Sequence, residues 1–173
     1  MEGWWAASYV VLWLLVVTLA ILVVALARQI GTLHLRLGPR GALELDDEGP
    51  PLGEAPAPLT TTDLDGRPIT IGGPGRAQLI LFVSPGCRVC DQVMPGAGPI
   101  AKARGLVSYL ISDDDGHTAP AAYSVPGTPY AVVLDDRGIV RAKGTINNLE
   151  QMEGLVESAM RRAEMGSREV HAL

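Results

Sequence analysis

The sequence predicts an α/β domain with a mixed central sheet, preceded by one N-terminal transmembrane helix. Three observations support this prediction. The first thirty positions hold a dense block of apolar residues. An apolar run at residues 79–83 leads directly to two cysteines three positions apart. Two later apolar runs flank a turn and precede a helical pattern, so antiparallel strands should join a parallel βα unit.

Length and charge limit the classes of protein. The 173 residues have room for one ordinary domain and an attachment, and a second core would hardly fit. A net charge of −5 and the lack of a basic stripe argue against a nucleic-acid partner. Two cysteines this close together cannot staple distant parts of a chain, so any chemistry they carry is local.

Residues 9–30 are predicted to be the transmembrane helix, with residues 1–8 as its flank. No charged residue occurs from position 3 to 27, and a helix of this length spans the roughly 30 Å hydrocarbon core of a bilayer. Aromatic residues that favour the membrane interface gather at its start: Trp4, Trp5, Tyr9 and Trp13. The alternative is a cleaved signal peptide, since Ala25-Leu26-Ala27 resembles a cleavage site, but signal peptides begin with basic residues and have shorter apolar stretches.

The charges beside this helix bear on its orientation. Arg28, Arg36 and Arg40 follow it and no Lys or Arg precedes it, so the positive-inside rule places the C-terminal domain in the cytoplasm. A tethered pair of exposed cysteines makes more sense in an oxidising compartment, where partners have disulfides to exchange. The two arguments conflict.

The chain after the helix is interpreted as a linker at 31–58, a domain at 59–166 and a flexible tail at 167–173. The linker is acidic and then proline-rich, a composition that should stay extended and solvated. At the start of the domain, Asp63–Arg67 has turn chemistry between apolar runs at Leu59 and Ile69–Ile71. We expect a small hairpin there.

The middle of the domain reads as strand, helix and strand. Leu79–Val83 is typical of a strand buried on both faces of a sheet. A helix should begin near the cysteines and run past Pro95, although glycine and proline at 96–99 predict that it is short or broken. A second buried strand is expected at Leu106–Ile111.

The last elements are a hairpin and a surface helix. Tyr130–Leu134 and Ile139–Ala142 flank a turn at 135–138 and should pair antiparallel. Apolar residues then recur at helical spacing up to Ala163, with Asn147 and Asn148 as an N-terminal cap and Gly166 as the expected end.

The two cysteines form a C-x-x-C motif at the start of a predicted helix. There the first sulfur faces unpaired backbone N–H groups and the positive end of the helix dipole, which favours the thiolate. Because the thiolate is the attacking species in thiol–disulfide exchange, Cys87 is predicted to be the nucleophile and Cys90 the resolving thiol.

Other uses of the cysteines fit less well. Zinc normally takes four ligands, and the other soft donors, His34, His117 and His171, are isolated. Haem attachment needs a histidine at position 91, where the chain has Asp91. A structural disulfide over so short a loop would stabilise little. We therefore expect neither a metal nor another cofactor.

Two charged groups invite further assignments. Asp113–Gly116 resembles a calcium loop, but position 111 lacks an acid and position 122 lacks a glutamate, so a solvated turn is the better interpretation. Four cationic side chains are interpreted as ordinary surface charge: Lys102, Arg104, Arg141 and Lys143.

The motif Cys87-Arg88-Val89-Cys90 with Pro95, followed by Tyr123–Pro129 and an apolar strand, resembles the thioredoxin superfamily. The resemblance implies a thioredoxin-like fold, a cis Thr128–Pro129 bond against the cysteines, and a substrate chain that pairs with backbone groups of Thr128. Gly86 replaces the usual tryptophan of that family, and Leu81 replaces its buried acid, so proton transfer at Cys90 must rely on water or another group.

A closer resemblance is to the MauD family, accessory proteins of methylamine utilisation. It rests on residues 11–31, Leu64–Pro74, the cysteine motif and Pro129–Gly144, and it covers most of residues 10–160. It implies a single-pass protein of the inner cell membrane with a periplasmic domain that helps mature the methylamine dehydrogenase light subunit. An upstream redox partner would then renew the cysteine pair.

Three functions follow from these observations. The first is a dedicated redox maturation factor with one principal client. The second is a general membrane-tethered thioredoxin, for example of the cytochrome c assembly type. The third is a non-catalytic assembly or binding module in which the cysteines are incidental. The direction of exchange depends on the relative stability of dithiol and disulfide, which the residues leave open.

Overall fold

The computed structural model describes residues 2–36, 48–113 and 118–171, and only the backbone at 2, 25–36 and 168–171. Acidic residues 46–47 and most of the rejected calcium loop, with His117, lie outside the described residues. The chain divides into two compact units, Met1–Pro39 and Arg40–Leu173.

The described part of the first unit is a single helix, α1, at Glu2–Arg36. Its segment Gly3–Val24 is long and apolar enough to cross a membrane, and its side chains are exposed. The hydroxyls of Ser8 and Thr18 in this segment donate to the carbonyls four residues earlier, each at 2.8 Å. These two polar groups are thus satisfied within the helix, as the interior of a bilayer requires. The prediction of one N-terminal apolar helix is confirmed.

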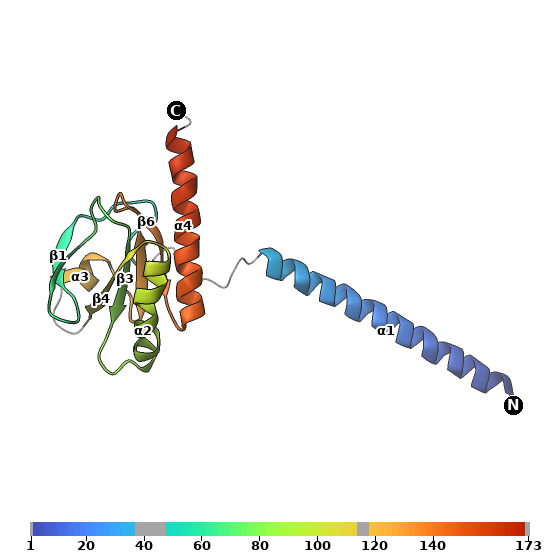
Figure 1. Cartoon of the computed structure of the whole chain (residues 1–173). Helices are drawn as coiled ribbons and strands as arrows, with labels where there is room; N and C mark the ends of the chain where they lie inside the picture. The colour runs from blue at the N-terminus through green and yellow to red at the C-terminus, as the bar shows by residue number, and fades with distance from the viewer. Residues whose placement is uncertain (1, 37–47, 114–117, 172–173) are drawn as a thin grey trace. The chain divides into compact units, whose positions relative to one another are not determined.

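The second unit has an α/β architecture around a mixed sheet (Figure 1). Its elements are, in order, β1 Leu59–Thr62, β2 Pro68–Ile71, β3 Gln78–Val83, α2 Arg88–Ala103, β4 Val107–Ser112, α3 Thr118–Ala122, β5 Tyr130–Leu134, β6 Val140–Thr145 and α4 Leu149–His171. The main sheet has the strand order β4-β3-β5-β6, with β3 and β4 parallel and the other pairs antiparallel. β1 and β2 form the expected hairpin.

The core has two layers, one on each face of the sheet. Every residue of β3 is buried, and its side chains alternate between the faces because successive residues of a strand point in opposite directions. Leu79 and Leu81 pack with residues of α2 and α4, whereas Ile80 and Phe82 pack with Ile71 and with residues of α3. This double cover explains the continuous apolar run.

Helix α2 is neither short nor broken, contrary to the prediction. It runs unbroken for 16 residues with Pro95 and Pro99 inside it. Both prolines lie on the exposed side, so the carbonyls they leave without a helical partner can bond to water. The opposite side supplies the buried residues Val93, Ala97 and Ala101. Packing of this side outweighs the helix-breaking residues.

Two further expectations about elements need correction. β4 is at the edge of the sheet, and Ile111 is its one fully buried residue, so it is a half-buried strand. Asn148 Oδ1 caps α4 by accepting from the Gln151 N–H at 2.8 Å, as predicted. However, α4 continues through Gly166 to His171, so residues 167–171 are helical rather than a flexible tail. Gly166 instead allows a close approach of Arg141, because a Cβ at Gly166 would lie 3.1 Å from Arg141 Nη1.

The end of the expected linker packs on the domain. Residues 48–54, which we call the strap, run along β6: the Gly53 N–H donates to the Val140 carbonyl at 2.9 Å, and the Val140 N–H donates to Glu54 at 2.8 Å. Pro50 is buried. An extended, solvated conformation is therefore wrong for the strap.

Candidate active site

The sheet register brings together two segments that are far apart in sequence. β3 ends just before the cysteine motif, and β5 begins just after Pro129. These strands are antiparallel, with Phe82 paired to Tyr130, so the end of one meets the beginning of the other. The cysteine turn and the residues 124–129, which we call the proline loop, therefore lie at the same end of the sheet.

Cys87 is the N-cap residue of α2. Its backbone is extended, with φ −79° and ψ 104°, and its sulfur accepts the N–H of Cys90 at 3.1 Å. The preceding Gly86 has φ +75°, a conformation that glycine adopts without strain. The sulfur of Cys87 thus lies where unpaired N–H groups and the helix dipole stabilise negative charge.

Cys87 and Cys90 are joined by a disulfide, with their Cα atoms 5.2 Å apart. Their accessibility differs. Cys87 is half-buried, whereas Cys90 is 1% exposed and belongs to the apolar core cluster that includes Leu81. An incoming thiolate can reach the first sulfur but not the second.

The proline loop is attached to the cysteine turn and to β6. The Thr128–Pro129 peptide bond is cis. The hydroxyls of Ser84 and Thr128 are hydrogen-bonded at 2.6 Å. On the other side, the Ile146 N–H donates to the Pro129 carbonyl at 3.0 Å. Pro129 is buried and Thr128 half-buried, so these two residues attach the loop to the turn that carries the disulfide and to β6.

Tyr123 is a buried residue of this region to which sequence reasoning gave no role. Its ring packs on Phe82, with centroids 5.8 Å apart, and it precedes Ser124, which has a positive φ of 49°. Burial raises the pKa of its hydroxyl to about 12. Within the described part of the chain this hydroxyl has no hydrogen-bond partner. The burial of Tyr123 could not be predicted from the sequence, because it depends on packing against α3 and against Phe82 of β3.

The surroundings of Cys90 offer no buried acid at the position where thioredoxins have one. Leu81 is fully buried there. Buried polar or charged side chains among the described residues are Gln78, Asp135 and Lys143. Gln78 and Lys143 adjoin Leu79 and Ala142 of the Cys90 cluster, so strand alternation points them to the opposite face of the sheet. Asp135 pairs with Arg141. Nor do three or more His, Cys, Asp or Glu side chains of the described ranges gather to hold a metal ion.

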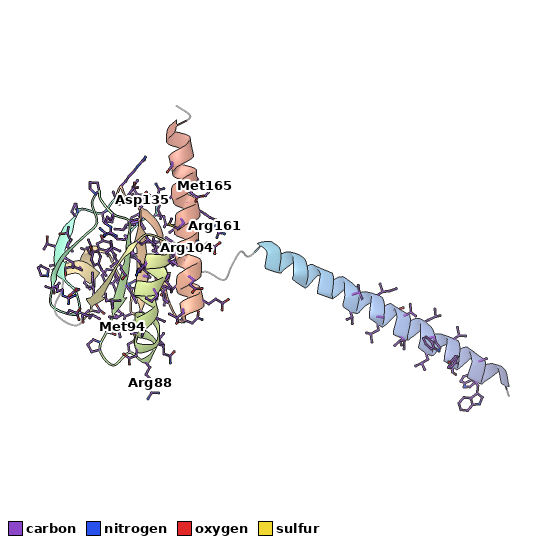
Figure 2. All side chains as sticks on the ribbon, in the orientation of Figure 1. Arg88, Met94, Arg104, Asp135, Arg161 and Met165 are labelled. Atoms are coloured by element: carbon purple, nitrogen blue, oxygen red, sulfur yellow. A yellow bond between two sulfur atoms is a disulfide. The ribbon has the colours of Figure 1, made fainter. Side chains whose placement is uncertain are left out.

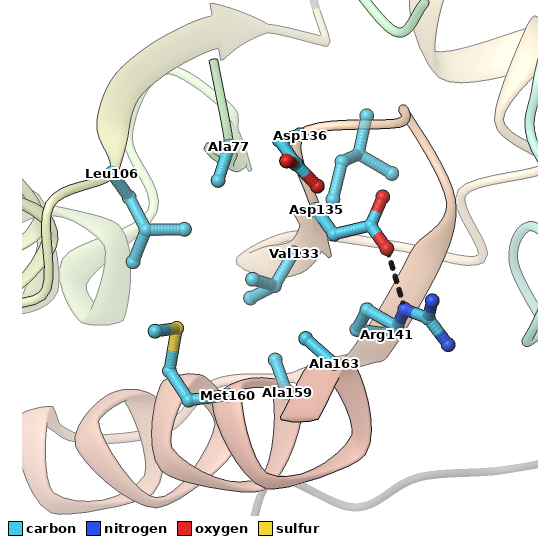
Figure 3. A pocket seen from close by; sticks show the side chains of 10 residues that line it. Ala77, Leu106, Val133, Asp135, Asp136, Arg141, Ala159, Met160 and Ala163 are labelled. Atoms are coloured by element: carbon cyan, nitrogen blue, oxygen red, sulfur yellow. Dashed lines mark hydrogen bonds and ion pairs between the residues drawn. The ribbon is translucent and has the colours of Figure 1, made fainter. Parts of the chain in front are cut away.

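Arg141 is not the surface charge that the sequence suggested. Its Nε donates to Asp135 Oδ2 at 2.7 Å, and its side chain is 16% exposed. The pair lines one side of an apolar pocket of about 190 Å³ between α4 and the sheet (Figure 3). Figure 2 shows Asp135 and Arg88 at opposite ends of the domain, so this pocket is remote from the cysteines.

Lys143 is not a surface charge either. It is 1% exposed, and its Nζ donates to the Glu48 carbonyl of the strap at 2.6 Å. Sequence periodicity gave no sign of this, because the partner lies 95 positions away. Lys102 and Arg104 are exposed, as expected.

Comparisons with known proteins agree with this geometry. No protein-family model matches the chain. The methylamine utilization protein MauD of Paracoccus denitrificans is 36% identical over 181 residues, covering 91% of this chain and 90% of the relative. MauD of Methylobacillus flagellatus is 36% identical over 180 residues, covering 91% and 87%.

Solved structures add evidence on the fold. A protein described as a disulfide isomerase from Bacteroides thetaiotaomicron matches with a TM-score of 0.55 at 19% identity, over 76% of this chain and 98% of the other. A thiol:disulfide interchange protein DsbE from Chlorobium tepidum matches with a TM-score of 0.52 at 17% identity, over 65% and 98%.

The fold, with a disulfide between a half-buried Cys87 and a buried Cys90, defines a thioredoxin-like protein whose N-terminal helix is long and apolar enough to cross a membrane. Within that class, 36% identity to MauD proteins over 91% of the chain singles out one family. The chain belongs to the MauD family of methylamine utilization proteins.

Proposed function

We propose that this protein exchanges disulfides with the methylamine dehydrogenase light subunit during its maturation, from a domain on the extracytoplasmic side of the membrane. The observation that carries the proposal is the contrast between a half-exposed, N-capping Cys87 and a buried Cys90 in a member of the MauD family. The class of client follows from the family resemblance.

In the reduced protein, the Cys87 thiolate would attack one sulfur of a client disulfide. The client's S–S bond breaks, a client thiolate leaves, and a mixed disulfide forms at Cys87. The Cys90 thiolate then attacks Cys87, which releases the second client thiol and leaves the Cys87–Cys90 disulfide. The client is reduced by two electrons and the protein oxidised by two. In the opposite direction, the same steps make a client disulfide, and an upstream redox partner restores the pair.

Thr128 and Pro129 are proposed to hold the client. The loop is hydrogen-bonded to the cysteine turn through Ser84, and Thr128 is half-buried, so the backbone of Thr128 can pair with an extended client segment. Leu81 and the other apolar neighbours of Cys90 supply no acid or base, so the proton on Cys90 would move through water.

A trapping experiment tests this function. Cys90→Ser leaves Cys87 able to attack and unable to be released, so clients stay bound as mixed disulfides in the host grown on methylamine. Recovery of the dehydrogenase light subunit is the expected result. A wide set of exported proteins would favour a general membrane-tethered thioredoxin.

A binding module is the remaining candidate function. A double Cys87→Ser, Cys90→Ser variant distinguishes it, because a binding module would keep supporting dehydrogenase maturation without either sulfur. Complete loss of maturation, at unchanged protein level, is the result expected for a redox factor. The two variants together decide among the three candidates.

A further inference from the structure

The strap contacts the two strands that follow and support the proline loop. The Glu48 carbonyl accepts hydrogen bonds from the Tyr130 hydroxyl at 3.1 Å and from Lys143 Nζ at 2.6 Å. Lys143 is 1% exposed, and a buried ammonium group depends on such polar partners. The strap therefore supplies part of what keeps Lys143 and Tyr130 in place.

Gly49 sets how closely the strap approaches β5. It has φ +76°, and a Cβ there would overlap the Tyr130 hydroxyl. Gly53, four residues later in the strap, has φ +81°, but a Cβ there would meet nothing within 4 Å. The two glycines share a backbone conformation and differ in what lies beside them.

Both strap partners are directly connected to the proline loop. Tyr130 follows Pro129 in the chain. Lys143 is on β6, and β6 pairs with β5 where Thr145 lies opposite Tyr130. Ile146, which follows Thr145, donates its N–H to the Pro129 carbonyl. A displacement of the strap would thus shift the strands on which the loop rests.

We propose that the strap, acting through Tyr130 and Lys143, positions the proline loop for a polypeptide substrate. This inference rests on the proposed function, since it concerns the same exchange reaction. A polypeptide must pair with the loop backbone, whereas a small disulfide needs only the Cys87 sulfur. Lys143, Tyr130 and Gly49 are therefore positioning residues, and their loss slows exchange with polypeptides selectively.

The test compares two oxidants of the reduced full-length protein in detergent micelles. One is a peptide with a single internal disulfide, and the other is hydroxyethyl disulfide. Either oxidant is converted to two thiols as Cys87 and Cys90 form their disulfide, so no other reagent is needed. We expect Gly49→Ala to lower the rate with the peptide about tenfold, because small misplacements are costly for oriented reactions. Its rate with hydroxyethyl disulfide should stay within about twofold of the wild type.

Gly53→Ala is the matched control, because it introduces the same strain of a side chain at positive φ without a contact to Tyr130. Its ratio of the two rates should equal that of the wild type. Lys143→Met is the second variant, which keeps the length of the side chain and removes the ammonium group. Lys143→Met should also lower the rate with the peptide while leaving the rate with hydroxyethyl disulfide nearly unchanged. If Gly49→Ala does not fold, this variant alone tests the positioning role.

Equal slowing with both oxidants, or an unchanged ratio in Gly49→Ala and Lys143→Met, would overturn the positioning role. A different result would remove the proposed function itself: failure of the wild-type protein to react with hydroxyethyl disulfide. The two failures are distinguishable because the first concerns a ratio between oxidants and the second the reactivity of Cys87.

Discussion

Tyr123 carries a buried hydroxyl that has no hydrogen-bond partner among the described residues. Burial raises its pKa from the ordinary value of 10.0 to about 12, because the apolar surroundings disfavour the phenolate. The unfolded chain therefore loses this proton first as the pH rises. The contribution of Tyr123 to stability is complete below pH 10 and declines between pH 10 and pH 12.

Tyr123→Phe should remove this alkaline decline. The free energy of unfolding of the wild type should fall by about 2 kcal/mol more than that of the variant between pH 10 and 12. At neutral pH the variant should be as stable as the wild type or more so, since the lost hydroxyl has no partner among the described residues. Urea denaturation at a series of pH values measures both effects. Parallel curves would contradict the prediction.

The hydrogen bond between Ser84 and Thr128 joins the cysteine turn to the proline loop. We expect a coupling energy of about 1 kcal/mol between Ser84→Ala and Thr128→Val, because a half-buried neutral hydrogen bond contributes about that much. The measurement is a double-mutant cycle of unfolding free energies. Strictly additive effects would show that the two hydroxyls contribute independently.

The turn of the β5–β6 hairpin is stabilised by several hydrogen bonds to one carboxylate, that of Asp135. Asp135 Oδ1 accepts the N–H groups of Arg137 and Ile139, each at 2.9 Å, while Oδ2 takes the Arg141 Nε. Gly138 completes the turn with φ +79°, packed against the backbone of Gly73. The turn is thus fixed by hydrogen bonds within it and by close packing against Gly73, which follows β2.

Gly138→Ala should destabilise the domain by at least about 2 kcal/mol, since its Cβ would come within 2.6 Å of the Gly73 carbonyl oxygen and neither backbone can yield cheaply. Gly66→Ala is the control. Gly66 has φ +77° with open space around it, so that variant pays only the backbone cost of about 1 kcal/mol. Thermal or urea denaturation of both variants isolates the contact with Gly73. Equal losses would show that the contact is unimportant.

The proposed function predicts the orientation of the whole molecule in the membrane. Arginines after α1 favour a cytoplasmic domain, whereas disulfide exchange with an exported client requires an extracytoplasmic one. We expect the proposed function to prevail over the charge rule, which is a bias summed over flanking residues.

Cysteine labelling tests this orientation. The chain has two cysteines, both in the domain, so after mild reduction a membrane-impermeant maleimide should label intact spheroplasts at Cys87. The half-exposed Cys87 should react well before the buried Cys90. The double serine variant controls for background. Labelling that appears only after lysis would place the domain in the cytoplasm.

Local patterns of the sequence determined most of the elements and the position of the cysteine pair. The apolar block forms α1, Leu79–Val83 forms a strand buried on both faces, and Asn148 caps α4. Each of these features depends on neighbours within a few positions, through helix or strand periodicity and capping. The placement of Cys87 at a helix N-terminus belongs to the same group.

Tertiary structure alone decided which charges are buried and what the linker does. Arg141 and Lys143 look like surface residues in the sequence, yet one pairs with Asp135 and the other bonds to the strap at Glu48. The hydroxyl of Tyr123 is likewise enclosed by elements distant in the chain. Local composition predicts how a segment behaves in water, but desolvation depends on partners brought by the register of the sheet. This is why the strap could be recognised only from the folded structure.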